Sequence, residues 1–287
     1  MEFFDEAAYL EANPDVSKAI ENGTLEGGWI HFNLFGFREN RPGLPRATAR
    51  RVRRLLDEAS VISVPPRHLR LRVSGMEDEE SFTKLGQVLS LSIEAAIQYG
   101  RLELTDGSSI LDFGCGCGRV LGWFGKLYPN CKLYGSDIDA EAIAWSRANQ
   151  PALADFACNS ELPPLMYDDE SFDLLFSISV FTHLPEQMQH AWLAELARVT
   201  KRGGHLLLSI HSKALLVTDS EVVLKQFQDD GFYYSVGDGT DGLPEFYQTT
   251  FHSEPYIRER WNEYFEVEAI LHRGVANHQD MVLCKRV

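Results

Sequence analysis

The residues best suited to bind a ligand lie in one glycine-rich segment near the middle of the chain. Residues 110–120 read ILDFGCGCGRV, an apolar run that ends in Asp112 and continues through Gly114, Gly116 and Gly118 into a helical pattern. Glycines at this spacing permit a tight strand-to-helix turn, close approach of a ligand to the backbone, and helix N-terminal amides that point at it. We therefore expect a ligand to lie across these three glycines.

The spacing of the glycines separates two classes of ligand. A glycine-rich first turn in an α/β protein binds either a dinucleotide, with the pattern G-x-G-x-x-G, or S-adenosylmethionine (SAM). Counted from Gly114 and Gly116, the third dinucleotide glycine would stand at Arg119, so that pattern is not met. An acidic residue followed by G-x-G-x-G resembles motif I of the class I SAM-dependent methyltransferases. The resemblance implies SAM as the cofactor and S-adenosylhomocysteine as its product.

Three segments further along the chain extend this resemblance. In residues 131–140, CKLYGSDIDA, Asp137 stands twenty-one positions after Gly116 at a predicted strand end, where a carboxylate can accept both ribose hydroxyls. NAD enzymes use the same device, so Asp137 indicates a nucleoside and not SAM in particular. Residues 155–186 resemble the family's run from strand 3 through strand 4, and residues 200–210 resemble its glycine pair before strand 5.

The resemblance assigns cofactor contacts to the glycine turn, to the ends of strands 2 and 4, and to polar residues after strand 3, which touch the adenine in that family. The cofactor-binding residues implied in this way are Asp112, Gly114, Cys115, Gly116, Gly118, Asp137, Ile138, Asn159, Ser160, Glu161 and Ser177.

Catalysis by such a protein consists mainly of alignment, because methyl transfer is an in-line displacement at a carbon that the sulfonium already activates. A base is needed when the nucleophile is an alcohol that must lose its proton. His183, in the run SVFTHLPE, stands where the family places residues near the methyl group, and histidine suits proton transfer near neutral pH. T-H-L-P is also typical of a helix start, with Thr182 or His183 as the cap. The alternative catalytic candidates are His211, His252, and His278 with Asp280.

The substrate is expected to contact residues 211–260, the stretch least typical of the family, because loops carry function on this scaffold. Within it, residues 235–256 are rich in glycine, aromatic and hydrogen-bonding groups, which suits the binding of a polar organic molecule. Residues 67–73 alternate leucine or valine with arginine or histidine, which predicts a strand with one cationic face that could bind a carboxylate of SAM or of the substrate. The substrate-binding candidates are Arg72, Tyr247, Gln248, His252 and Tyr256. Single polar residues in a packed loop are also typical of a purely structural role.

Net charge and missing motifs narrow the acceptor. The net charge of −15 disfavours nucleic acid, whose binding depends on neutralised phosphates. Residues 177–180 read SISV in place of the N/D-P-P-Y signature of DNA and protein amide methyltransferases, and no acidic pair follows strand 4, so we expect no metal. What remains is transfer to an O, N or C nucleophile of a small molecule or glycan precursor. The alternative is a regulatory or scaffold module that binds SAM or S-adenosylhomocysteine without turnover.

Strand-like and helix-like runs alternate from residue 81 to the end of the chain, which predicts an α/β fold with helices on both faces of a parallel sheet. The family resemblance implies a Rossmann-like sheet of seven strands, whose last two strands, at 264–274 and 278–287, form an antiparallel hairpin with strand 7 between strands 5 and 6. The remaining strands are predicted at 109–113, 132–136, 154–158, 172–179 and 205–210, and helices at 81–100, 117–128, 139–149 and 185–200.

Composition shifts divide the chain into an accessory module at 1–45, a linker at 46–80 and the methyltransferase domain at 81–287. Residues 9–43 resemble an accessory unit found on bacterial surface proteins and on enzymes of glycan assembly. We expect either a small helical cap that packs its aromatic residues against the main domain or a surface for a protein partner or a second copy. Those aromatic residues are Trp29, Phe32, Phe35 and Phe37. The linker is expected to hold an amphipathic helix at 46–59 and the extended basic segment at 67–73.

The predicted location is the cytoplasm. No apolar run approaches the ~20 residues that a membrane helix needs, and the first ten residues lack the basic region of a secretory signal. The five cysteines form no C-x-x-C pair, and Cys115 and Cys117 fit the glycine turn as small residues.

Overall fold

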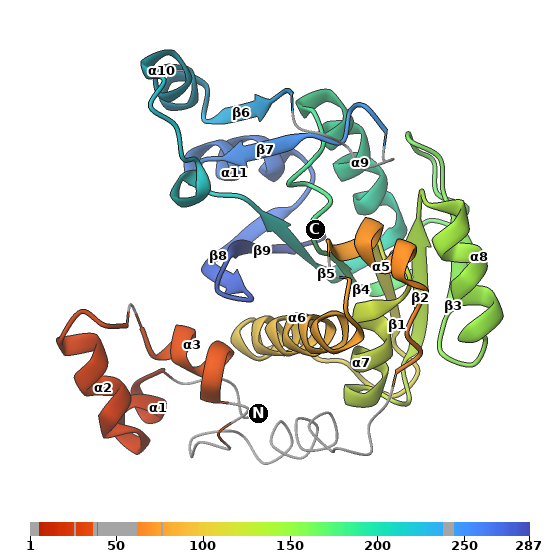
Figure 1. Ribbon diagram of the computed structural model, residues 1–287, viewed down its shortest axis with the longest axis horizontal. Helices are drawn as coiled ribbons and strands as arrows, with labels where there is room; N and C mark the ends of the chain where they lie inside the picture. Colours follow the sequence, from red (N-terminus) through yellow and green to blue (C-terminus); the bar gives the residue numbers. More distant parts are fainter. Residues whose placement is uncertain (1–5, 26, 37–38, 40–61, 76, 238–243) are drawn as a thin grey trace.

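A seven-stranded sheet in the order β3-β2-β1-β4-β5-β9-β8 forms the centre of the molecule (Figure 1). The computed structural model describes residues 6–25, 27–36, 39, 62–75, 77–237 and 244–287. The strands β3, β2, β1, β4 and β5 pair in parallel, and β9 runs antiparallel to its two neighbours, β5 and β8. The expected α/β fold, with its final strand inserted before the sheet edge, is confirmed.

The strand bounds agree closely with the predicted ones, except that β4 and β9 end two residues early, β8 begins two residues late, and β5 begins before its glycine pair. The strands of the main sheet are β1 (Ser109–Phe113), β2 (Lys132–Asp137), β3 (Asp155–Cys158), β4 (Phe172–Ser177), β5 (Thr200–Ile210), β8 (Glu266–Val275) and β9 (Gln279–Lys285).

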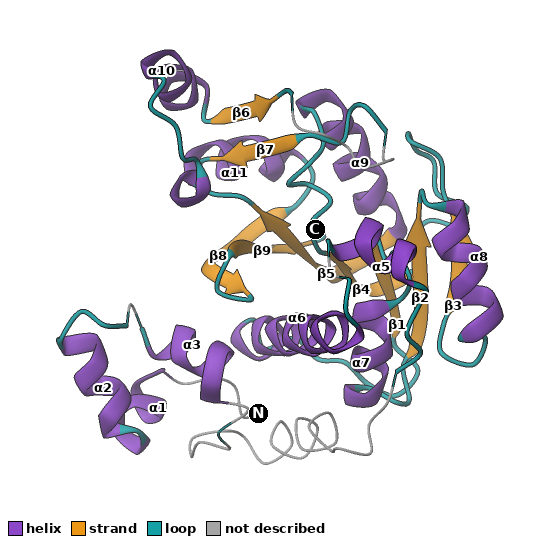
Figure 2. Ribbon diagram, in the orientation of Figure 1, coloured by secondary structure: helices purple, strands orange, loops and turns teal. Residues whose placement is uncertain are grey.

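Helices cover both faces of this sheet (Figure 2). Successive residues of β4 point to opposite faces, so Leu174 and Phe176 pack with the helices of one face and Leu175 with those of the other. The helices of the first face are α6 (Glu79–Tyr99), α7 (Arg119–Leu127) and α8 (Ala140–Asn149), and those of the second are α9 (Glu186–Val199) and α11 (Glu254–Arg260). None of the described helices has the length and apolar character that a membrane span requires.

The N-terminal residues form a small helical unit beside α6, as expected. Its elements are α1 (Glu6–Ala12), α2 (Pro14–Glu21), α3 (Gly28–His31) and the π-helical turn η1 (Phe32–Gly36), which contacts α6. Tyr9 and Phe32 are fully buried, and the Tyr9 hydroxyl lies 2.9 Å from Nδ1 of His31. Phe35, in contrast, is 45% exposed, and its ring lies against the edge of this core, 5.4 Å from that of His31 between centroids. The side chain of Trp29, Phe37 and the helix expected at 46–59 lie outside the described residues.

The basic segment at 67–73 is a helix, so the prediction of an extended strand is wrong. α5 (Arg67–Ser74) begins after Pro66 and ends at Gly75, whose φ of 66° is a left-handed helix cap. At helical spacing, Leu69 and Val73 share one face and pack together toward the glycine turn. An alternating pattern of seven residues does not distinguish this arrangement from a strand, and Pro66 and Gly75 decide it.

The atypical stretch at 211–260 adds a two-stranded sheet and two helices between β5 and the final hairpin. Its elements are η2 (Lys213–Leu215), α10 (Glu221–Asp230), β6 (Phe232–Ser235), β7 (Thr249–His252) and α11, followed by η3 (Trp261–Glu263). The start of β7 is bonded to the loop after β4: the Gln248 N–H donates to the His183 carbonyl at 3.1 Å, and the Thr250 N–H donates to the Thr182 carbonyl at 2.8 Å. This insertion therefore helps to position the loop that carries His183.

Candidate functional site

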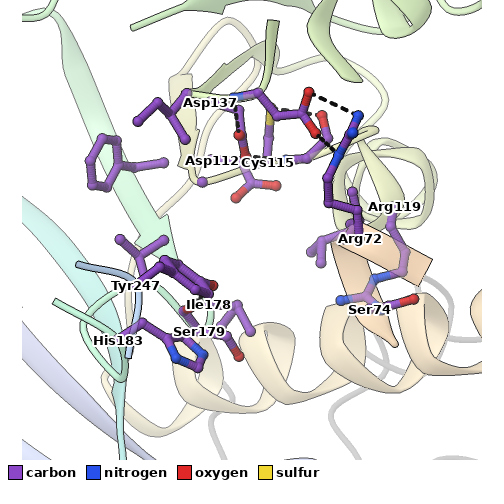
Figure 3. A pocket seen from close by; sticks show the side chains of 18 of the residues that line it. Arg72, Ser74, Asp112, Cys115, Arg119, Asp137, Ile178, Ser179, His183 and Tyr247 are labelled. Atoms are coloured by element: carbon purple, nitrogen blue, oxygen red, sulfur yellow. Dashed lines mark hydrogen bonds and ion pairs between the residues drawn. The ribbon is translucent and has the colours of Figure 1, made fainter. Parts of the chain in front are cut away.

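A cavity of about 590 Å³ opens at the carboxyl ends of β1, β2 and β4, beside Arg72 and Ser74 of α5 (Figure 3). Ligands bind at this edge in open α/β sheets, and the volume is typical of a small-molecule site. Most of the predicted cofactor residues line it, namely Asp112, Gly114, Cys115, Gly116, Asp137, Ile138, Asn159, Ser160 and Glu161.

The glycine turn adopts the backbone conformation expected of it. Gly114 and Gly116 have φ values of 85° and 53°, which favour glycine. A Cβ at Gly114 would overlap the side chain of Val180, and one at Gly116 would lie 2.6 Å from Val73 of α5. Gly118 is the N-cap of α7 and lies outside the cavity lining, so its role is to start the helix. The turn thus leaves its backbone exposed to the cavity.

Asp137 is held rigidly at the end of β2. Its Oδ2 accepts a hydrogen bond from the Gly116 N–H at 2.6 Å, and its Oδ1 accepts one from the Asp139 N–H at 2.8 Å. A carboxylate oxygen can accept more than one bond, so both oxygens remain able to accept from a ligand. Burial raises the pKa of Asp137, and the two backbone donors oppose that effect. This arrangement suits a diol such as the two ribose hydroxyls.

Asp112 and Arg119 place a carboxyl group and a guanidinium at the cavity. Several atoms of these two groups have no hydrogen-bond partner. Within the described part of the chain, Oδ2 of Asp112 and both Nε and Nη1 of Arg119 are buried and unpaired. The Arg119 guanidinium lies over the ring of Phe82, 5.5 Å from its centroid. Burial lowers the pKa of Arg119 to about 10, while burial and the nearby Asp137 raise the pKa of Asp112 well above its ordinary value. Unpaired buried polar atoms of this kind are costly and indicate a ligand with matching groups.

A ligand with both an ammonium and a carboxylate matches that pair of residues. The methionine part of SAM is such a zwitterion, and the ribose of SAM is the diol that Asp137 can accept. The residues of this cavity wall therefore fit SAM. Arg119 is a site residue that the sequence analysis missed, because it was considered only as the position where a dinucleotide glycine is lacking.

The opposite wall of the cavity carries His183, Tyr247 and Ser179 (Figure 3). The rings of His183 and Tyr247 are stacked, with centroids 4.1 Å apart and planes 19° from parallel. The Tyr247 hydroxyl donates to the Ser179 carbonyl at 3.0 Å, and Nδ1 of His183 lies 2.6 Å from the Gln248 carbonyl oxygen. His183 is thus a catalytic candidate that faces the cavity. Tyr247, which lies beside it, is a substrate-binding candidate that also faces the cavity.

Two of the other catalytic candidates, His252 and His211, lie behind this wall. His252 is fully buried, its Nε2 lies 2.9 Å from Oε1 of Gln189, and burial lowers its pKa to about 3. His211 is outside the cavity lining, 6.1 Å from His183 between ring centroids. Burial and the neighbouring His183 and His278 lower the pKa of His211 to about 4. His278 does line the cavity, and its neighbour Gln279, which the sequence analysis did not single out, lines it too.

Three more predicted residues make structural contacts. Ser177 is buried and donates from Oγ to the Phe113 carbonyl at 2.8 Å. The Tyr256 hydroxyl donates to Oε1 of Glu186 at 2.7 Å, outside the cavity. Gln248 is also outside the lining, and its side-chain amide donates to the Glu245 carbonyl at 2.9 Å.

Arg72 lines the cavity edge, but its guanidinium already binds carboxylates of the chain itself. It forms two hydrogen bonds with Asp139, of 2.6 and 3.2 Å, and one with Glu141 of 2.7 Å. These contacts attach α5 to the start of α8. Across the described residues, no group of three or more histidine, cysteine or acidic side chains is placed to hold a metal ion.

The comparisons with known proteins agree with the fit to SAM. Residues 111–208 match the model of a family described as a methyltransferase domain. Methyltransferase GfsG of Streptomyces halstedii is 29% identical over 115 residues, which cover 39% of this chain and 40% of that protein. A tRNA (carboxymethyluridine(34)-5-O)-methyltransferase of Arabidopsis thaliana is 38% identical over 110 residues, which cover 38% of this chain and 25% of that protein. The chain thus spans less than half the length of either relative.

The fold has known counterparts as well. The crystal structure of a SAM-dependent methyltransferase from Methanosarcina mazei superposes with a TM-score of 0.50 at 19% identity, covering 66% of this chain and 96% of that one. Residues 111–208 therefore match a methyltransferase domain, and the chain shares its fold with a SAM-dependent methyltransferase of known structure.

Proposed function

We propose that this chain transfers a methyl group from SAM to an O, N or C nucleophile of a small molecule or glycan precursor. The observation that carries the proposal is one wall of the cavity. There Asp137 offers two acceptor oxygens, Asp112 an unpaired carboxylate oxygen, and Arg119 the unpaired Nε and Nη1 of its guanidinium. When bound, SAM supplies an electrophilic methyl group on a sulfonium.

The residues of the chain have separate tasks in this proposal. Asp137 binds the ribose hydroxyls, Asp112 the ammonium and Arg119 the carboxylate of SAM. Asn159 contacts the adenine and is oriented for it, because its Oδ1 accepts from the Ser136 hydroxyl at 2.7 Å and its Nδ2 donates to the Ser160 carbonyl at 2.8 Å. The wall with His183 and Tyr247 receives the acceptor and excludes water from the reacting atoms.

A small acceptor is favoured over a nucleic acid. The Arabidopsis relative is named for a tRNA substrate, but only a quarter of its length is matched. The net charge of −15 opposes the binding of a polyanion, which needs many cationic contacts. The acceptor wall also includes Tyr247 of the insertion at 211–260, and a cavity of about 590 Å³ has the size of a small-molecule site.

Calorimetry with SAM and S-adenosylhomocysteine tests the cofactor part of the proposal, and a screen of phenols, sugars and amines for S-adenosylhomocysteine release tests the transfer. We expect binding of both ligands and release with at least one acceptor class. Binding without release would favour the regulatory or scaffold module, and the absence of binding at millimolar ligand would reject both functions.

A further inference from the structure

We propose that Gln279 selects the acceptor. Its side-chain amide, held in place by Ser179, binds a hydroxyl or N–H group that the acceptor carries beside the atom that receives the methyl group. This inference rests on the proposed methyl transfer and adds a substrate class to it, namely compounds with two neighbouring polar groups. Two observations carry it: the place of the Gln279 amide in the cavity wall, and the use of its hydrogen-bonding positions.

The amide of Gln279 stands at the end of a row of apolar side chains. Gln279 is the first residue of β9, and alternate residues of a strand point to the same face, so Met281 and Leu283 share its face. Both are buried in the core that includes residues of α6. Gln279 is buried too, with 8% exposure, but it lines the cavity. A buried amide is costly where an apolar side chain would continue the row, so its position at the cavity indicates a ligand contact.

Two side chains use part of this amide. The Ser179 hydroxyl donates to Oε1 of Gln279 at 3.2 Å, and Nε2 of Gln279 donates to Oγ of Ser179 at 2.9 Å. The second hydrogen on Nε2 is left for Nε2 of His211, which lies 3.3 Å away. Burial lowers the pKa of His211 to about 4, so its ring is neutral near neutral pH and has a bare nitrogen that can accept this hydrogen.

One position of the amide remains for a ligand. An amide oxygen has two lone pairs, and within the described parts of the chain the Ser179 hydroxyl is the one donor to Oε1. The second lone pair can therefore accept a hydrogen bond from a molecule in the cavity. A neutral amide accepts from an uncharged hydroxyl or N–H without burying a net charge. An acceptor that uses this position must carry such a donor.

The backbone of Ser179 is held in an uncommon conformation that keeps its hydroxyl at Gln279. Its φ is 61°, in the left-handed region, which a glycine would adopt without steric cost. The Ser179 N–H donates to Oγ of Ser209 in β5 at 2.7 Å, and the Ser179 carbonyl accepts from the Tyr247 hydroxyl of the insertion at 3.0 Å. A strained backbone persists where its surroundings over-determine it, and such residues cluster at functional sites. The strain at Ser179 thus supports a use for its side chain.

The pair of Ser179 and Gln279 lies where the acceptor is expected. Ser179 is on the wall with His183 and Tyr247, which receives the acceptor (Figure 3). Val275, the cross-strand partner of Gln279, also lines the cavity, so an apolar side chain stands beside the amide. A small ring with two adjacent polar groups fits these surroundings, since one group can react while the other binds Gln279.

Turnover with matched probes tests this selection. The pairs are catechol with phenol, trans-1,2-cyclohexanediol with cyclohexanol, and 1,2-diaminobenzene with aniline. In at least one pair we expect kcat/KM for S-adenosylhomocysteine release to be about 3- to 10-fold higher for the member with two polar groups, beyond the statistical advantage of two equivalent nucleophiles. The difference should lie in KM, because the second group is bound alike before and during the reaction.

Gln279→Met keeps the length of the side chain and removes the amide. It should lose the preference through a higher KM for the two-group probe, with kcat and SAM affinity within about twofold of the wild type. The ratio for the same two probes in two proteins cancels their intrinsic reactivity. Ser179→Gly, whose backbone accepts the positive φ, should weaken the preference, and it gives the same comparison if Gln279→Met does not fold.

NMR signals of the Gln279 side-chain amide test the contact without turnover. In the S-adenosylhomocysteine complex these signals, assigned by their loss in Gln279→Met, should shift on addition of the preferred two-group probe and not of its one-group partner. Unshifted Gln279 signals in a protein that binds the probe would overturn the proposed contact.

Gln98→Met is the matched control, because Gln98 is also a glutamine with 8% exposure, donates from Nε2 to Glu94, and is outside the cavity lining. It should keep the preference. A full preference retained in Gln279→Met, an equal loss for both members of a pair, or no preferred two-group probe in a protein that binds SAM would each overturn the proposal. Failure of the wild-type protein to bind SAM would instead reject the proposed function.

Discussion

Replacing Arg119 with methionine separates the two parts of SAM recognition. The Nε and Nη1 atoms of Arg119 are buried and unpaired, and we assign them to the carboxylate of the methionine part. Hydrogen bonds to charged groups contribute about 1.5–3 kcal/mol each. Since 1.4 kcal/mol is a factor of ten in affinity, the loss of even one such bond in Arg119→Met should raise the Kd of SAM by about 10- to 150-fold.

The same substitution should not destabilise the protein without ligand. A buried guanidinium with two atoms that lack a hydrogen-bond partner costs several kcal/mol of desolvation, and its contact with the Phe82 ring returns about 2 kcal/mol. The Tm of the ligand-free variant should therefore equal or exceed that of the wild type. Loss of affinity together with retained Tm is the signature of a ligand-binding residue and not of a structural one.

The assay is calorimetry with SAM and with 5′-methylthioadenosine, which keeps the nucleoside and lacks the amino acid part. Arg119→Met should weaken SAM and leave 5′-methylthioadenosine nearly unchanged. Lys126→Met is the matched control, because Lys126 also lies over an aromatic ring of α7, that of Trp123, and is outside the cavity lining. SAM affinity within threefold of the wild type in Arg119→Met, or an equal loss for both ligands, would refute the assignment.

Three other substitutions test neighbouring parts of the account. Asp137→Ala should weaken SAM and 5′-methylthioadenosine alike, by about tenfold or more in calorimetry, and a loss restricted to SAM would contradict the ribose assignment. Gly116→Ala should lower Tm more than Gly107→Ala does. Both glycines have positive φ, but only at Gly116 would the new Cβ meet a side chain, that of Val73. Equal changes in Tm would count against a close approach of Val73 to Gly116. Burial lowers the pKa of His252 to about 3, so only the unfolded chain takes up its proton below pH 6.5. The free energy of unfolding should fall as the pH drops from 6.5 toward 3, by up to about 1.4 kcal/mol per pH unit, and urea unfolding of His252→Leu should lack that contribution; an identical pH slope in both proteins would be inconsistent with it.

Features that depend on local sequence could be predicted. The glycine turn and Asp137 follow from residues close together in the chain, because strand, turn and helix N-terminus are consecutive. The sheet order, with β9 beside β5, followed from the family resemblance and was confirmed. Short patterns were weaker evidence: Leu69 and Val73 fit a strand and a helix equally well until the flanking Pro66 and Gly75 are considered.

The sequence pattern could not predict the role of a side chain whose partners lie far away in the chain. Arg72 was expected to bind a ligand carboxylate, but folding places α8 beside α5 and supplies the carboxylates of Asp139 and Glu141. Arg119 is important for the opposite reason, since folding leaves parts of its guanidinium unpaired. His252 and His183 have the same chemistry in sequence, and only the packing of β7 against the loop after β4 places one in the core and the other at the cavity.

A crystal structure of the complex with S-adenosylhomocysteine tests the central claim most directly. The account predicts the ribose hydroxyls within hydrogen-bonding distance of Asp137 and the carboxylate of the amino acid part on Arg119, with the thioether sulfur directed toward the wall of His183 and Tyr247. A ligand bound outside this cavity, or one whose carboxylate lies away from Arg119 while its sulfur points away from His183, would contradict it.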